Sequence, residues 1–165
     1  MKTVASVLPY MIPGFNTYYG MFRGCTRITT IPRKFIRAVN GITDTSCAHM
    51  FNGCTNLATV PELPATTLDA YCYSGMFNGC TSLTTAPELP ATTLAYNSYA
   101  SMFDGCTSLN SITCLATNIS ASYCTYQWVT GVASTGTFTK AASMSSWTTG
   151  NDGIPRGWSV VDYTE

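Results

Sequence analysis

The sequence predicts an α/β repeat fold: a right-handed solenoid in which short parallel strands alternate with short helical turns, closed by an irregular C-terminal cap. Three observations predict it. A unit of about 26 residues recurs along the chain, its apolar residues fall at every third position, and only 10% of the 165 residues are charged while 45% are hydrophobic. This composition excludes a disordered chain. A unit this short buries its apolar edge only against a neighbouring copy.

The recurring unit is visible in the printed sequence. Its four copies, of which the middle two are nearly identical, occupy 18–32, 47–68, 73–94 and 99–115. The methionines that anchor the copies are separated by 29, 26 and 26 residues, at Met21, Met50, Met76 and Met102. The next equivalent position is Gln127, where Trp128 replaces the Phe of the unit. An atypical last copy is typical of a stack that shields its final layer.

Each unit contains one predicted strand. Apolar residues recur at every third position in the third copy, at Phe77, Cys80, Leu83, Ala86 and Leu89. This spacing favours a coil whose short straight segments turn corners over a long helix or strand. The predicted strands are 28–31, 57–60, 83–86 and 109–112. Prolines follow three of them and are expected to stop them, at Pro32, Pro61 and Pro87.

A short helical turn that ends at the Met-Phe pair is predicted near 68–77 and 94–103. Just after the pair, every copy has a glycine where a left-handed residue would end the turn. These glycines are Gly24, Gly53, Gly79 and Gly105. Stacking the copies would place equivalent strands about 4.8 Å apart in a narrow parallel sheet on one face, with the turns on the other.

We expect three parts in the chain. Residues 1–17 form an N-terminal cap or linker, 18–132 the solenoid of about four repeats plus a half repeat, and 133–165 the C-terminal cap. Trp147 and Trp158 are expected to pack inside this cap. No run of 18 or more apolar residues occurs, so the sequence predicts no transmembrane segment.

The phrase MFxGCTSL, followed by a strand, a proline and an ATTL turn, resembles the BspA-like leucine-rich-repeat surface proteins of gut Bacteroidetes. The segment 133–163 is similar to the closing segment of such arrays, so the resemblance covers residues 18–163. It implies a leucine-rich-repeat-like solenoid. The first copy departs from the pattern, with Arg27 and Ile28 in place of Ser and Leu.

The resemblance also implies a class of function. Such modules act in recognition and adhesion, so we expect a noncatalytic protein, extracellular or on a cell surface, that binds a protein or glycan of a host or neighbouring cell. The same module occurs in phages of these hosts. The alternative is therefore a structural or receptor-binding component of a Bacteroides phage particle or tail appendage, located in the virion.

Two groups of residues are predicted to bind a partner. Solenoids bind along their strand faces, and here strand positions that alternate between inward and outward would give a flat, uncharged face lined by Thr29, Thr59, Thr84, Thr85 and Asn110. Six of the eight basic residues precede residue 41. Arg33, Lys34 and Arg37 either keep an exposed end of the stack soluble or recognise an acidic partner, a sulfated glycan, an upstream domain or an oligomer partner through residues 1–40.

Six tyrosines lie before the Met-Phe steps and either cover the turns or contact a partner: Tyr71, Tyr73, Tyr96, Tyr99, Tyr123 and Tyr126. Nucleic acid is not an expected partner, because the formal net charge is zero.

No catalytic, cofactor or metal site is predicted, so the chain is not expected to be an enzyme. Most polar groups recur with the unit, as Glu62 and Glu88 do, whereas catalysis needs a unique local arrangement. The single histidine, His49, stands where other copies have Gly or Ser, which predicts a solvent-side or turn position. No Cys-x-x-Cys pair or Cys/His cluster has zinc spacing. The eight cysteines are expected to be mostly free and buried, with Cys114 and Cys124 the best candidates for a disulfide.

Overall fold

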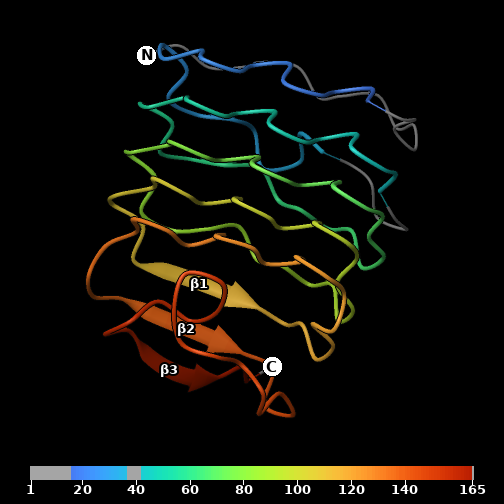
Figure 1. The fold of residues 1–165 in the computed structure, drawn as a ribbon. Coiled ribbons are helices and arrows are strands. Elements are labelled where there is room, and N and C mark those ends of the chain that lie inside the picture. The colour runs from blue at the N-terminus through green and yellow to red at the C-terminus, as the bar shows by residue number, and fades with distance from the viewer. Residues whose placement is uncertain (1–15, 37–41, 165) are drawn as a thin grey trace.

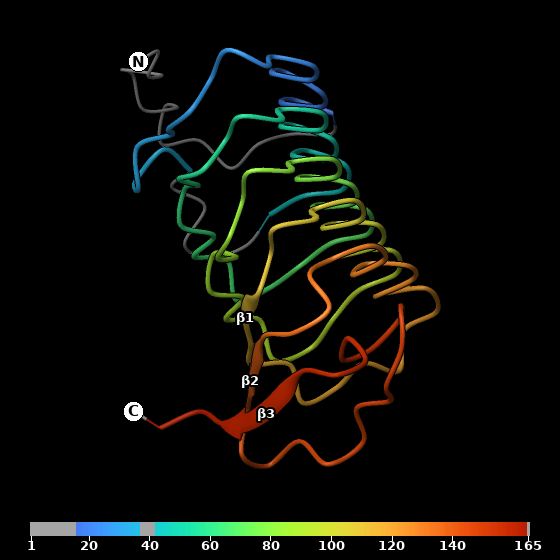
Figure 2. The ribbon, with the colours of Figure 1, turned by 90° about the vertical axis from the view of Figure 1, so that its left-hand side faces the viewer.

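The structure, a computed structural model, describes residues 16–36 and 42–164. The chain winds in stacked layers, with the N-terminal layers at one end and the C-terminal strands at the other (Figures 1 and 2). We call each layer a coil and number the coils by their described residues: 16–36 with 42–43, 44–69, 70–95, 96–121 and 122–147. The predicted N-terminal cap lies outside the described residues, apart from its last two positions.

Regular secondary structure in the described part of the chain is one open parallel sheet. Its strands are β1 (Ser111–Cys114), β2 (Thr137–Lys140) and β3 (Ser159–Asp162), in the order β1-β2-β3. In the sheet, Thr137 lies between Ser111 and Ser159. Short parallel strands are therefore confirmed (Figure 1). Among residues 16–36 and 42–164, no helix could span a bilayer.

Prolines account for how far each strand extends. The first three predicted strands are reduced to isolated parallel bridges, such as the one between Thr85 and Ser111. In the third coil Pro87 follows directly and has no N–H to donate to a ladder. In the fourth coil the position equivalent to Pro87, 26 residues later, is Thr113, which has an N–H group. The strand there continues through it for four residues. The fourth predicted strand thus begins two residues late, at Ser111.

The segments before the Met-Phe pairs are not helical, so the predicted helical turns at 68–77 and 94–103 are wrong. Their amide groups alternate instead. In the third coil the N–H of Tyr73 donates to the carbonyl of Ser98 in the next coil (3.1 Å), and that of Ser74 donates back to Tyr71 (3.0 Å). We call this element the turn ribbon; it occupies 16–25, 45–54, 71–80, 97–106 and 123–132.

Left-handed residues explain the turn ribbon. In the third coil every fourth residue has positive φ: 54° at Tyr71, 58° at Gly75 and 71° at Gly79. An α-helix cannot continue through residues at this spacing, because each one breaks the right-handed run that i to i−4 bonding needs. The predicted left-handed conformation of Gly24, Gly53, Gly79 and Gly105 is confirmed, with φ of 71° to 74°. These glycines lie within a ribbon and end no helix.

The core is built from equivalent side chains stacked on one another. The parallel rings of Phe22, Phe51, Phe77 and Phe103 have successive centroid distances of 5.5, 5.7 and 5.9 Å. The residues predicted at every third position are buried, at Phe77, Cys80, Leu83, Ala86 and Leu89. Each layer therefore buries its apolar edge against the next, which is how short units without long elements become stable.

The cysteines form a second column. All eight are free and seven are buried, so the expectation of free, buried thiols is confirmed. Cys114 and Cys124, the best candidates for a disulfide, are free as well. The thiols of Cys54, Cys80 and Cys106 each donate to the carbonyl of a Phe in the preceding coil, at 3.0 to 3.2 Å. These thiols thus link adjacent coils as well as filling space.

The end of the stack differs from the prediction in two ways. Residues 133–164 are not irregular throughout, because they contain the two short strands β2 and β3. Thr137 of β2 stands 26 residues after Ser111, so the spacing persists where the motif has vanished. The equivalent of Met102 is Trp128, not Gln127. The carbonyl of Trp128 accepts the N–H of Phe103 (2.9 Å), as that of Met102 accepts the N–H of Phe77.

Candidate functional site

The residues of the predicted uncharged face lie on the strand side of the coils. Thr59, Thr84, Thr85 and Asn110 are exposed, and Thr29 is half-buried. The predicted alternation between inward and outward is wrong, because both members of the pair Thr84 and Thr85 face solvent. The reason is that a single bridge at Thr85 leaves the backbone free to turn a corner, whereas only a continued strand would impose alternation.

Of the predicted basic group, the structure describes Arg33 and Lys34. The Arg33 guanidinium faces Glu62 of the second coil: Nη2 lies 2.6 Å from Oε1, and Nε donates to the same oxygen at 2.8 Å. Lys34 is exposed. Arg37 lies outside the described residues. Arg33 therefore belongs to the strand side, where it neutralises a carboxylate of its own chain.

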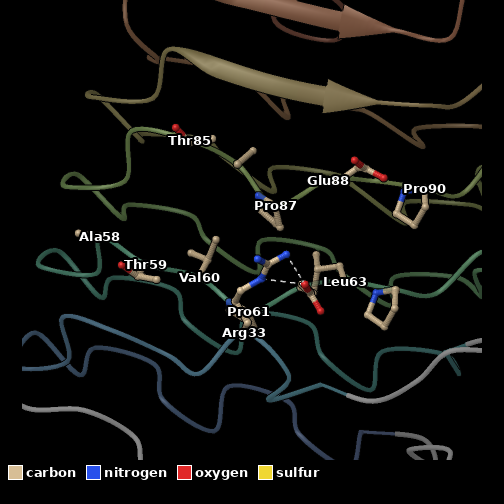
Figure 3. Close-up of a pocket in the computed structure, with 13 residues that line it drawn as sticks. Arg33, Ala58, Thr59, Val60, Pro61, Leu63, Thr85, Pro87, Glu88 and Pro90 are labelled. Atoms are coloured by element: carbon tan, nitrogen blue, oxygen red, sulfur yellow. Dashed lines mark hydrogen bonds and ion pairs between the residues drawn. The ribbon is translucent and has the colours of Figure 1, made fainter. Parts of the chain in front are cut away.

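Beside the predicted face, a groove with a volume of about 560 Å³ opens between the second and third coils. Its lining comes from two Pro-Glu-Leu-Pro segments, with all of 61–64 and with Pro87, Glu88 and Pro90 of 87–90, together with 58–60, 85–86 and Arg33. Figure 3 shows Thr85, Pro87 and Glu88 along one wall and Thr59, Val60 and Pro61 along the other. The groove therefore includes Thr59, Thr85 and Arg33, three of the residues predicted to bind a partner.

The groove exists because main-chain pairing stops on this side. Between the third and fourth coils, Ala86 and Leu89 donate to Ser111 and Thr113, at 2.9 and 3.0 Å. Between the first and second, Ile31 donates to Thr59 at 2.9 Å. Between the second and third coils, no described main-chain hydrogen bond joins 56–68 to 83–94. The turn ribbons of these two coils remain bonded, so the layers part only on the strand side.

The side chains at the gap oppose closure. Residues 61–64 and 87–90 have the same sequence, so pairing these coils would place Glu88 beside Glu62 and proline beside proline. Like charges directly opposite each other in a sheet are destabilising, and proline has no N–H to pair. The third coil also has one extra residue, a β-bulge, in its pairing with the fourth. Thr85 and Leu89 are four positions apart, but their partners Ser111 and Cys114 are only three positions apart.

The groove carries a negative formal charge. Glu62 shares its carboxylate with Arg33, whereas Glu88 is exposed and has no ion-pair partner among the described residues. Two carboxylates and one guanidinium leave one net negative charge. The floor is apolar, because Leu63, Pro61 and Pro87 are buried. A cleft of this size with an apolar floor and few polar groups is typical of a ligand site.

Other titratable groups are engaged in structure. Burial raises the pKa of the Cys47 and Cys106 thiols to about 12, so both stay protonated near neutral pH. Burial, and then the charge of Arg23, lowers the pKa of His49, whose φ of 55° places it in a ribbon turn as predicted. In the described ranges, no three His, Cys, Asp or Glu side chains gather as metal ligands.

Among the described residues five tyrosines are exposed, and one of them, Tyr19, lies beside His49. Of the six that were predicted to cover turns or contact a partner, Tyr73 and Tyr99 are buried and stack at 6.2 Å. The other four line a separate edge with ring centroids 5.3 to 6.2 Å apart, at Tyr71, Tyr96, Tyr123 and Tyr126.

Comparison with protein-family models, curated proteins and solved structures finds no match to this chain. The resemblance of its motifs to leucine-rich-repeat surface proteins therefore stays a prediction. Sequence reasoning also missed Val60, Leu63 and Glu88 as groove residues. The signal that could have found them is the identity of the Pro-Glu-Leu-Pro segment in adjacent copies, which places like beside like.

Proposed function

We propose that the chain is a noncatalytic recognition module, a leucine-rich-repeat-like solenoid displayed outside the cell or on its surface. In this proposal the strand side binds a protein or glycan of a host or neighbouring cell. The motif resemblance supports the class of function, and the strand side supplies the surface.

One observation carries the proposal: the exposed Thr59, Thr84, Thr85 and Asn110 lie on successive coils beside an open groove. Stacked rings and interlocking ribbon bonds hold these coils behind the exposed residues. A preordered surface loses little conformational entropy on binding, so many modest contacts can add to a useful affinity.

The noncatalytic part of the proposal rests on where reactive groups lie. Seven of the eight thiols are buried, and desolvation raises the pKa of those of Cys72, Cys80 and Cys114, which disfavours the nucleophilic thiolate. The polar side chains at the groove are two copies of one glutamate, an arginine that pairs with the first, and two threonines.

A screen against immobilised glycans and matrix proteins tests the proposal, using the full chain and a variant with Thr59, Thr84 and Thr85 changed to Arg. We expect the variant to lose at least about tenfold in affinity for any partner found. The matched control changes Thr66, Thr67 and Thr92, exposed threonines beyond the Pro-Glu-Leu-Pro segments of the same two coils, to Arg. Equal affinity of both triple variants would refute the proposal.

A further inference from the structure

The gap between the second and third coils leaves two strand edges without partners. In the coils on either side, the positions equivalent to Val60, Leu63 and Glu88 donate their N–H groups across the interface, as Ala86, Leu89 and Glu62 do. At the gap, Val60, Leu63 and Glu88 make no described main-chain bond. Unpaired edges of this kind are templates on which an extended chain can add as a strand.

The walls of the groove suit an extended chain better than a compact ligand. The two Pro-Glu-Leu-Pro segments run along opposite sides, so the opening is a slot parallel to the coils, with Thr59 and Thr85 toward one end and Pro90 toward the other (Figure 3). Prolines at 61, 64, 87 and 90 interrupt the donors without covering them. An extended peptide presents its own N–H and C=O groups alternately, which matches edges that pair at intervals.

Charge selects among such peptides. Glu88 is exposed and has no ion-pair partner in the described ranges, and Glu62 is only partly satisfied by the exposed guanidinium of Arg33. A basic side chain between the two carboxylates would relieve the repulsion that keeps the coils apart. An acidic side chain at that place would add to it.

We propose that this groove binds an extended peptide that bears a lysine or arginine. Its main chain pairs with the free strand edges at Val60, Leu63 and Glu88, and its basic side chain lies between the carboxylates of Glu62 and Glu88. The proposal rests on the recognition function proposed above and deepens it, because it names the partner as a protein segment. A glycan would leave the amide edges without the regular acceptors of a strand.

Fluorescence anisotropy with a defined probe tests the proposal on the full chain. The probe is a fluorescein-labelled peptide of sequence TVTKVTV, and the matched probe has Glu in place of Lys. We expect the lysine peptide to bind at least about tenfold more tightly than the glutamate peptide. Glu88→Gln should remove most of that preference, whereas Asp69→Asn, a change of an exposed carboxylate away from the groove, should leave it intact.

Hydrogen exchange locates the bound peptide. We expect the amides of Val60, Leu63 and Glu88 to exchange rapidly in the free protein and to slow at least about tenfold when the lysine peptide is bound. The amides of Ala86 and Leu89, already bonded to the fourth coil, should change little.

Binding without protection of the gap amides, or no preference for lysine over glutamate, would overturn the inference. The inference would also be overturned if the chain bound a glycan in the screen but did not bind the lysine peptide. In that case the proposed recognition function would still hold. If the screen finds a protein that binds the strand side, and the lysine peptide displaces that protein, both proposals would be supported.

Discussion

The two sides of the same coils respond differently to repetition. On the turn-ribbon side every described step between coils is bonded, from the N–H of Tyr18 to Ser46 (2.8 Å) through that of Gly105 to Thr130 (2.8 Å). On the strand side the ladder is interrupted once, between the second and third coils. The ribbon bonds use only the backbone, so any copy can pair with any other. Strand pairing also brings side chains of neighbouring copies face to face.

The interruption falls between the two copies that are most alike. Where neighbours differ, they pair: Arg33 of the first coil meets Glu62 of the second, and Thr113 of the fourth meets a segment that contains Glu88. Identical neighbours instead place glutamate beside glutamate. Identical copies stack apolar rings favourably but place like charges side by side. The Phe51 and Phe77 rings therefore stack between the second and third coils, although the strand side of the same two coils is unpaired.

The largest expected effect is a loss of stability at high pH, when the buried thiols on the ribbon side ionise. Burial raises the pKa of Cys47 and Cys106 from 9.0 to about 12, so both remain protonated in the folded protein when an unfolded chain would ionise them. This stabilisation is complete below about pH 9 and is lost as pH rises toward 12. Each thiol should lower the free energy of unfolding by about 1.4 kcal/mol per pH unit in that window.

Urea titrations at pH 7, 8, 9, 10 and 11 measure this loss. From pH 9 to 11 the two thiols together account for about 5 kcal/mol, comparable with the whole stability of a small domain. Cys106→Ala should make the decline shallower by about 1.4 kcal/mol per pH unit. A free energy of unfolding that stays constant to pH 11 would contradict the burial of these groups.

A smaller effect is expected from Gly75→Ala in the third ribbon. Gly75 has φ of 58°, and an added Cβ would overlap the imidazole of His49. The left-handed conformation alone costs a non-glycine residue about 1 to 2 kcal/mol, so thermal or urea unfolding should show at least that loss.

Two controls separate strain from overlap at this position. Ser101→Ala, at the equivalent place in the next coil with φ of 50°, should change stability by less than about 0.5 kcal/mol. Adding His49→Ala to Gly75→Ala removes the overlapping ring but keeps a Cβ at position 49, whose φ is also positive, so it should recover only the part of the loss due to overlap. A Gly75→Ala protein as stable as the parent would contradict the ribbon geometry.

The smallest expected effect sharpens the strand side. Glu88→Lys places a cation opposite Glu62, so the second and third coils should approach each other and gain about 0.2 to 1 kcal/mol of stability. Exchange of the Val60 and Leu63 amides should slow at the same time. The reverse change, Glu62→Lys, removes the partner of Arg33 and should destabilise instead. Equal effects of the two changes would show that charge does not hold the gap open.

Sequence reasoning succeeded where a residue's own preference decides the outcome. The period, the buried positions such as Phe77 and Leu83, and the left-handed Gly79 follow from apolarity or from the absence of a Cβ. The turn ribbon could not be predicted, because Tyr71 gives no signal of its left-handed backbone. β2 and β3 were missed because the Met-Phe motif had vanished from copies that kept the spacing.

The groove lies at the limit of what one sequence can show. Glu62 and Glu88 were recognised as copies of each other, and Arg33 as part of a basic group. Whether these charges attract or repel depends on which of them are neighbours in adjacent coils. The stacked structure shows this, and the sequence alone does not.

In the turn ribbon, N–H groups that donate to the next coil alternate with N–H groups that close their own turn, so the bonding pattern repeats every two residues. Insertion or deletion of one residue there would exchange the amides that face the next coil with those that close their own turn, and every later contact of that ribbon would fall out of phase. The three extra residues of the first coil avoid this. Arg33 pairs with a residue 29 positions later and Ile42 with one 26 positions later, so the surplus lies between them. The extra residues therefore lie outside the turn ribbon, in which a gain or loss of a single residue would break the alternation.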